Sequence, residues 1–246
     1  MNPEVARRWH AWSEQLEGRI RWMYLDIKGL VTTGVGNLID PVEYALPLPW
    51  MVSATGQRAT EAQIRAEWQH MKANPDLARR GARAAGEVAT LSLTDAAVDA
   101  LVLAKLEEND AVYARRILGW QAWPWQAQMV RHSIGWACGP HAGYPRFEAA
   151  VARGDWKTAI TECLIPGEAT NRGLIARNAA QRALLKELQN AAPAPAPGAP
   201  VPGPSPGTVA APATAGAAPP APRSGSWLEG IVALLRSMRS IFVRKA

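Results

Sequence analysis

Cysteine is scarce in this chain of 246 residues, which contains only Cys138 and Cys163. Two cysteines allow one disulfide at most, and the sequence does not separate a bonded pair from two reduced thiols. A secretion signal is also missing, because the N-terminal stretch MNPEVARRWHAWSEQLEG is charged and has no apolar run before a small-residue cleavage site. The sequence therefore predicts synthesis in the cytoplasm without export by the general secretory route.

Sequence patterns for metal binding are absent as well. None of the four histidines belongs to an H-E-x-x-H motif or to a similar pair of closely spaced ligands. These histidines are His10, His70, His132 and His141. A zinc amidase is therefore disfavoured, and we expect neither a metal ion nor an organic cofactor.

Charge is nearly missing from residues 191–225, which consist almost wholly of Ala, Pro, Gly, Ser, Thr and Val around the single Arg223. Such a composition cannot bury a core and predicts a disordered, flexible linker. Residues 191–246 hold five basic side chains and one acid, and so carry +4 of the formal net charge of +6. This asymmetry predicts that the C-terminal end meets an anionic membrane or lipopolysaccharide, and it argues against a nucleic-acid surface on residues 1–190.

The C-terminal stretch 226–246 has the pattern of a cationic amphipathic helix, with Glu229 and Arg236 opposite an apolar face. The apolar face comprises Trp227, Leu228, Ile231, Leu234, Leu235, Met238, Ile241 and Phe242. Its longest charge-free run, 230–235, is far shorter than the roughly twenty residues that span a bilayer. We therefore expect it to lie in a membrane interface, with docking on a partner protein or on the folded domain as the alternative.

The remaining residues, 1–190, carry mostly helical patterns. Asn2 and Pro3 are typical of a helix start, and Gly18 of a helix end. Two β-like runs, 21–25 and 30–35, predict a hairpin. A proline-rich irregular segment is expected at 40–58, and further helices at about 60–72, 94–118, 124–138, 145–153, from 156 onward, and 172–189. The order predicts an α+β domain that is mainly helical, with a small N-terminal hairpin region.

The most specific motif lies in LEGRIRWMYLDIKGLVTTGVGNLI, residues 16–39. A glutamate ends a helix, an aspartate follows at the hairpin, and a threonine comes six residues later. The spacing E-G-(five residues)-Y-x-D-(two residues)-G-(two residues)-T-x-G-x-G resembles the signature of the phage-type lysozymes, glycoside hydrolase family 24. The matching residues are Glu17, Gly18, Tyr24, Asp26, Gly29, Thr32, Gly34 and Gly36. The resemblance covers about residues 1–190 and is strongest in the first forty.

This resemblance implies a lysozyme-like catalytic domain that cleaves the glycan strands of bacterial peptidoglycan. Breaking a glycosidic bond requires a proton for the leaving group and a stabilised, water-attacked oxocarbenium-like centre. Glu17 would be the general acid, with a pKa raised by partial burial. Asp26 would stabilise the positive charge and orient water together with Thr32. Inversion at the anomeric carbon is implied, for which carboxyl groups roughly 6.5–9.5 Å apart are typical.

Further residues are candidate contacts to the saccharide. Many members of the family have histidine after the last glycine of the signature, whereas this chain has Asn37, which leaves the pH optimum open. Trp50, in the proline-rich segment, is a candidate wall of a cleft. The stretch EATNRGLIARNAAQRALL resembles the part of the family that lines the groove. Its candidate contacts are Glu168, Asn171, Arg172 and Arg177.

Several biological settings remain open. We expect a monomeric muramidase that acts on the cell wall in the periplasm, either as a phage endolysin for host lysis or as a secreted antibacterial effector. A peptidoglycan-binding virion module without catalysis is the second class, and the presence of both Glu17 and Asp26 argues against it. A lytic transglycosylase works with one glutamate and no water-activating partner, so Asp26 and Thr32 argue against that reading.

Overall fold

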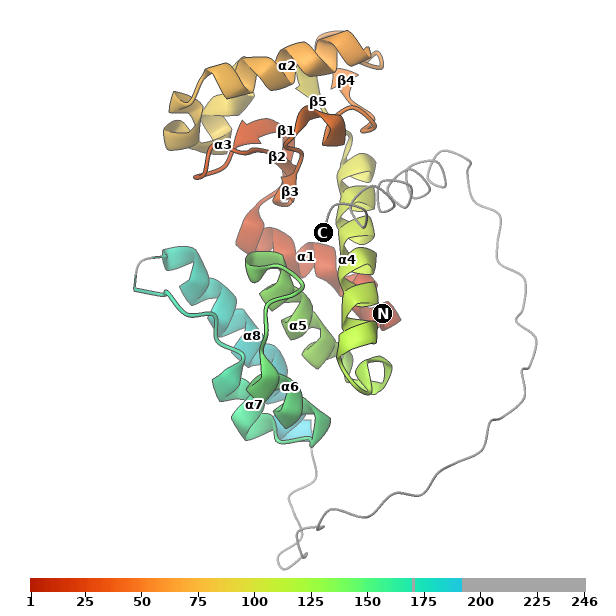
Figure 1. Cartoon of the computed structure of the whole chain (residues 1–246), viewed down its shortest axis with the longest axis vertical. Helices are drawn as coiled ribbons and strands as arrows, with labels where there is room; N and C mark the ends of the chain where they lie inside the picture. Colours follow the sequence, from red (N-terminus) through yellow and green to blue (C-terminus); the bar gives the residue numbers. More distant parts are fainter. Residues whose placement is uncertain (170, 192–246) are drawn as a thin grey trace, which may run out of the picture.

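The computed structural model describes residues 1–169 and 171–191, which form two lobes joined by a long helix (Figure 1). The predicted C-terminal helix, 226–246, and all of the predicted linker except Ala191 lie outside the described residues. The α-helices are α1 (Pro3–Glu17), α2 (Glu61–Ala73), α3 (Asp76–Val88), α4 (Asp95–Arg116), α5 (Trp125–Cys138), α6 (Pro145–Ala152), α7 (Trp156–Glu162) and α8 (Arg172–Ala191). The strands are β1 (Ile20–Leu25), β2 (Val31–Gly34), β3 (Asn37–Leu38), β4 (Met51–Val52) and β5 (Leu91–Ser92), and two short 3-10 helices are η1 (Val42–Tyr44) and η2 (Trp120–Ala122).

The first lobe contains the strands together with α2 and α3. Strands β1, β2 and β3 form an antiparallel sheet in that order, and β4 pairs with β5 in a second antiparallel ribbon. Helices α2 and α3 pack on β1. The carboxylate of Glu67 on α2 is buried and accepts hydrogen bonds from the Thr90 and Leu91 amides and from the Thr90 hydroxyl, so it fastens β5 to this helix.

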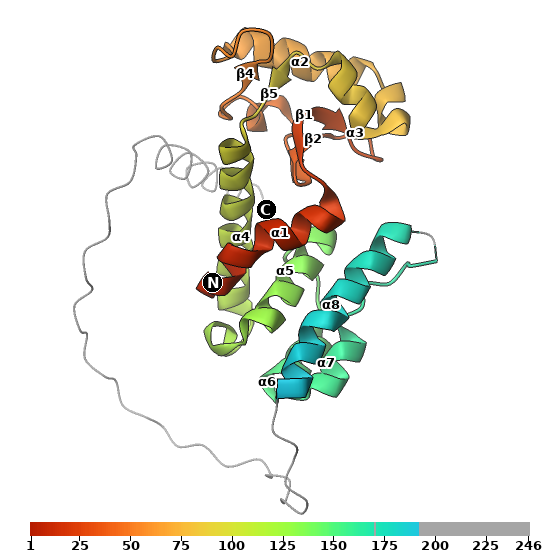
Figure 2. The same ribbon diagram turned by 180° about the vertical axis from the view of Figure 1, so that it is seen from behind.

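The second lobe is helical and consists of α1 and α5 to α8. Helix α8 packs on α5 and α7, and α1 packs on α5 (Figure 2). Its aromatic core includes Trp9, Tyr113, Trp120 and Phe147, each no more than 1% exposed. Helix α4 runs from the strand lobe into the helical lobe and contributes to both (Figure 2).

Local sequence signals located most helices correctly. The Thr60–Gln63 capping box begins α2, and the Thr94 hydroxyl caps α4 by accepting from the Ala97 amide. The prediction of a mainly helical α+β fold with a small antiparallel hairpin is confirmed. Helix α3 was not predicted, because Gly81 (φ 79°) breaks its helical geometry and interrupts the apolar period.

Among the described residues, no helix combines the length and the apolar character needed to cross a bilayer.

Candidate active site

Glu17 is the last residue of α1, at the point where the chain leaves the helical lobe for the sheet. Gly18 follows with φ 71° and ψ 176°, and its amide donates to the Glu14 carbonyl. A side chain at this φ would be strained, so glycine allows the abrupt exit from the helix. Strand β1 begins two residues later, and the Glu17 side chain remains 24% exposed. The Glu-Gly pair therefore places a half-buried carboxylate at the junction of the two lobes.

Arg177 on α8 forms an ion pair with Glu17 and fixes its carboxylate. The guanidinium also donates to the carbonyl and the hydroxyl of Ser133 on α5, at 3.3 and 3.1 Å. The side-chain Nε2 of Gln181 donates to the same hydroxyl at 2.9 Å. Because three helices hold Arg177, its side chain is only 8% exposed. Arg177 was predicted from the sequence as a saccharide contact, whereas its burial and its partners make it a positioning residue for Glu17.

Asp26 lies in the tight turn between β1 and β2. Its Oδ1 accepts hydrogen bonds from the amides of Lys28 and Leu30, at 2.8 and 2.9 Å. Gly29 closes the turn with φ 73°. Among the described residues, Oδ2 of Asp26 has no hydrogen-bond partner. One oxygen thus shapes the turn, and the other is available to a ligand.

Tyr24 and Thr32 face each other across the hairpin. They are register partners in β1 and β2, so their side chains lie on one face of the sheet. Asp26 lies just past the end of β1, and its amide donates to the Leu30 carbonyl at 2.9 Å, so the pairing of the hairpin continues to this residue. Thr32 is only 5% exposed, and its hydroxyl donates to the Leu30 carbonyl at 3.2 Å. Because the hydroxyl acts as a donor in this hydrogen bond, its oxygen lone pairs can still accept another one.

The negative charges of Glu17 and Asp26 both act on the phenol of Tyr24. Burial raises the pKa of Tyr24 to about 12, and the negative charges of Glu17 and Asp26 act in the same direction. Both carboxylates therefore lie near this phenol, although one belongs to a helix end and the other to a turn. The structure brings the predicted acid, the predicted aspartate and Thr32 to one region.

Asn37 supports the β2–β3 turn. Its Oδ1 accepts from the Val35 amide at 3.1 Å, and a Cβ on Gly34 would lie 2.7 Å from that oxygen. The Val35 carbonyl in turn accepts from the Trp136 indole on α5 at 2.9 Å. Glycine at 34 is required both by this close approach and by its φ of 65°. The last part of the motif therefore docks the sheet on the helical lobe, and Asn37 serves the turn.

Trp50 was predicted from the sequence to form the wall of a cleft. The structure contradicts this prediction. It is 0% exposed, and its indole donates to the Ala45 carbonyl at 2.9 Å within the core of the strand lobe. The proline-rich segment folds back as η1 and β4 and closes over the ring. A large apolar side chain next to an irregular segment is buried here because the segment itself covers it.

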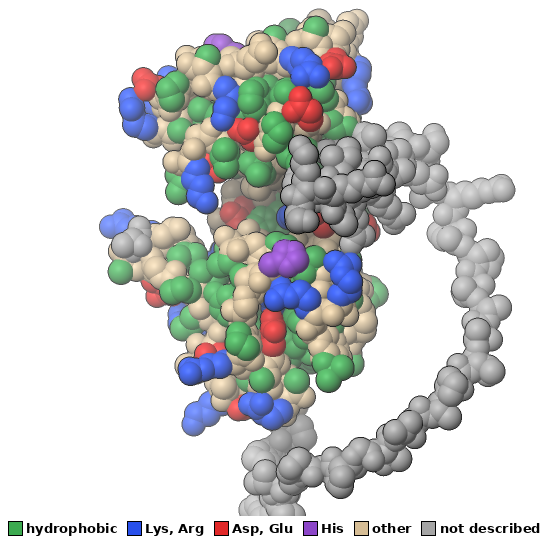
Figure 3. Space-filling model, viewed as in Figure 1, with side chains coloured by type: hydrophobic (Ala, Val, Ile, Leu, Met, Phe, Trp, Pro, Cys, Tyr) green, Lys and Arg blue, Asp and Glu red, His purple; other side chains and the backbone are tan. Residues whose placement is uncertain are grey.

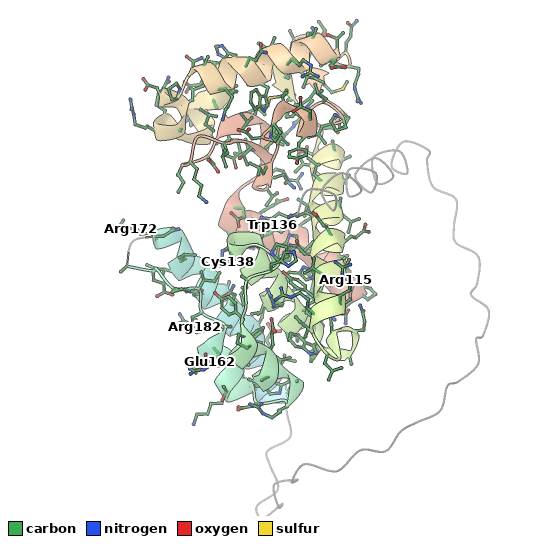
Figure 4. All side chains as sticks on the ribbon, in the orientation of Figure 1. Arg115, Trp136, Cys138, Glu162, Arg172 and Arg182 are labelled. Atoms are coloured by element: carbon green, nitrogen blue, oxygen red, sulfur yellow. The ribbon has the colours of Figure 1, made fainter. Side chains whose placement is uncertain are left out.

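The three remaining candidates lie just before α8 or at its first residue. The side-chain Oδ1 of Asn171 accepts from the Gly173 backbone amide at 3.0 Å, and the Glu168 carboxylate accepts from the side-chain Nδ2 of Asn178 at 2.8 Å. Arg172 is exposed at the first residue of the helix and extends away from the helical lobe (Figure 4). Among the described residues, Arg172 has no hydrogen-bond or ion-pair partner. Of the three candidates, it is therefore the one that could contact a ligand without breaking an existing interaction.

Figure 3 shows the surface hollowed between the two lobes. The β1–β2 turn with Asp26 and the first turn of α8 face each other across this hollow (Figures 1 and 2). Two other hollows, of about 420 and 390 Å³, lie along α6 and α7. The only carboxylate that lines them is Glu162, which lies 3.7 Å from Arg146. They offer no pair of acids, so the junction of the lobes is the stronger candidate site.

Sequence reasoning missed the residues that support this site. Ser133, Gln181 and Trp136 were assigned to no site, because nothing in their local sequence shows that α5 and α8 meet the end of α1. Tyr24 belongs to the motif, but its pairing with Thr32 follows only from the strand register.

Comparison of the chain with protein-family models, with curated proteins and with solved structures finds no significant match.

Proposed function

We propose that this chain is a peptidoglycan muramidase, which hydrolyses the β-1,4 bond between N-acetylmuramic acid and N-acetylglucosamine. The observation that carries the proposal is that the negative charges of Glu17 and Asp26 both act on the phenol of Tyr24, the register partner of Thr32. Paired carboxyl groups beside a groove are what glycoside hydrolysis needs. The lysozyme-like signature of residues 16–39 adds to this argument.

In the proposed reaction, Glu17, which pairs with Arg177 as a carboxylate in the resting structure, first takes up a proton and then delivers it to the glycosidic oxygen as the bond to the anomeric carbon breaks. Water attacks that carbon and gives up a proton to Oδ2 of Asp26, which completes the hydrolysis with inversion at the anomeric carbon. Arg177 holds the Glu17 carboxyl group in place. The open Oδ2 of Asp26 faces the positive charge that develops on the sugar, and the Thr32 oxygen can accept a hydrogen bond from the water.

The proposed setting is host lysis by a phage endolysin, with an antibacterial effector as the alternative. In both settings the substrate lies in the periplasm and the chain acts as a monomer. The basic C-terminal helix expected from the sequence would hold the enzyme at an anionic membrane.

Digestion of purified peptidoglycan tests the activity, with mass spectrometry of the released fragments. The wild-type chain should release fragments with reducing ends. Glu17→Gln should lower the rate by about 100-fold or more, because proton transfer by a positioned acid contributes about 10²–10⁴. Glu43→Gln, which changes an exposed glutamate in η1, is the matched control and should retain full activity.

Other outcomes would overturn the proposal in distinguishable ways. Anhydro ends would indicate a transglycosylase. Equal activity of Glu17→Gln would remove Glu17 from the chemistry. Binding of peptidoglycan without any cleavage by the wild-type chain would support the non-catalytic module.

A further inference from the structure

A second cluster of side chains lies between α1 and α4, outside the proposed catalytic residues. His10 and Glu14 are one helical turn apart on α1, and Asp99 lies on α4, which packs against α1. One ligand atom from each residue lies within 4.8 Å of the others. Imidazole nitrogen and carboxylate oxygen are ligands that zinc and related divalent ions accept.

The ring of His10, whose side chain is 30% exposed, places its Nδ1 next to Asp99. Its Nδ1 is buried and has no hydrogen-bond partner among the described residues. The same nitrogen lies 3.4 Å from Oδ1 of Asp99. Bonds of about 2.0–2.1 Å to a tetrahedral zinc ion place two ligand atoms about 3.4 Å apart. The spacing of this nitrogen and oxygen is therefore already that of two ligands of one ion.

Arg19 neutralises the two carboxylates in the structure. Its guanidinium donates to Oε1 of Glu14, at 2.8 and 2.5 Å, and to Oδ1 of Asp99. Among the described residues, Oε2 of Glu14 and Oδ2 of Asp99 have no partner. A cation therefore already occupies one side of the cluster, and a metal ion would compete with it.

We propose that His10, Glu14 and Asp99 bind a divalent ion of the zinc class, in exchange for the guanidinium of Arg19. The ion would clamp α1 to α4 through three protein ligands, with water at the fourth position. It would also release Arg19, which lies between the end of α1 and the start of β1. Metal binding would thus act on the connection between the two lobes. The inference goes beyond the proposed muramidase activity and does not depend on it.

Calorimetric titration of the full chain with zinc chloride tests the site. We expect one high-affinity zinc ion, an affinity lower by about tenfold or more in His10→Ala and in Asp99→Asn, and an affinity higher by about tenfold in Arg19→Gln. His141→Ala removes an exposed histidine outside the cluster and is the matched control. Magnesium chloride should give no comparable binding, because magnesium prefers oxygen ligands and retains its water.

The gain in Arg19→Gln is the decisive result, since a folding defect would not raise the affinity for zinc. Unchanged or weaker binding by this variant would refute the exchange. Zinc binding that is unchanged in His10→Ala would refute the site. The site would also be refuted if the wild-type chain showed no saturable binding up to about 1 mM zinc chloride. Circular dichroism of each variant separates loss of a ligand from loss of the fold.

Discussion

Arg177 and Glu17 form an ion pair across 160 positions of the chain. The pair joins the start of α8 to the end of α1, and Ser133 on α5 completes the arrangement. The carboxylate that the motif singles out is therefore held by a residue from the opposite end of the folded domain. Its position depends on the packing of three helices.

Replacement of Arg177 by methionine should destabilise the chain by about 2–4 kcal/mol. Breaking a buried pair costs about 3–5 kcal/mol, and the 24% exposure of Glu17 reduces this value. Urea unfolding measures the change, and Arg172→Met, at an exposed position, should stay within about 0.5 kcal/mol. In the double variant Arg177→Met/Glu17→Gln, the loss of stability should differ from the sum of the two single losses by about 1 kcal/mol or more. Additive effects would contradict the pair.

Trp50→Ala should lower stability without a specific effect on catalysis. Truncating a fully buried tryptophan costs about 3–5 kcal/mol, and Trp50 is 0% exposed. Thermal unfolding checks the loss, and Trp50→Phe should lose less because it retains most of the ring. Under conditions where each variant is folded, peptidoglycan digestion should match the wild type. A raised KM with unchanged stability would restore the cleft-wall interpretation.

Stability should fall as the pH drops below about 6.5, because His132 is buried as the neutral imidazole. Burial lowers the pKa of His132 to about 3, while the nearby Asp110 carboxylate opposes this shift and the Arg131 guanidinium adds to it. Between pH 6.5 and 3 the unfolded chain binds the proton and the folded chain does not. Unfolding is therefore favoured as the pH falls through this window.

The loss from His132 should be about 2 kcal/mol between pH 6.5 and 5, at about 1.4 kcal/mol per pH unit. Urea unfolding over this range measures it. His132→Phe should remove this part of the slope, since the ring lies among the aromatic rings of Trp9, Tyr113 and Trp120. His141→Ala, at an exposed histidine, should leave the slope intact. An unchanged slope in His132→Phe would contradict the assignment.

Features that depend on neighbours in the chain could be predicted from the sequence. The Thr60 and Thr94 caps began helices where expected, because a cap needs only a few consecutive residues. The Glu17-Gly18 helix end and the Asp26 turn also follow from local backbone rules. Helix α3 was not predicted because Gly81 breaks its helical period. A second glycine, Gly86, is needed where the helix packs on Trp22, since a Cβ there would lie 2.6 Å from the ring, and this tertiary contact is not visible in the sequence.

The sequence by itself thus determined most of the helices, the β1–β2 hairpin, its turn chemistry and the pattern Glu17, Asp26 and Thr32. Only the tertiary structure decided which side chains meet: Arg177 with Glu17, and His10 with Asp99. It also decided that the segment after β3 buries Trp50. The physical reason is that capping and turn formation are local interactions, whereas ion pairing and burial depend on the packing of segments far apart in the chain.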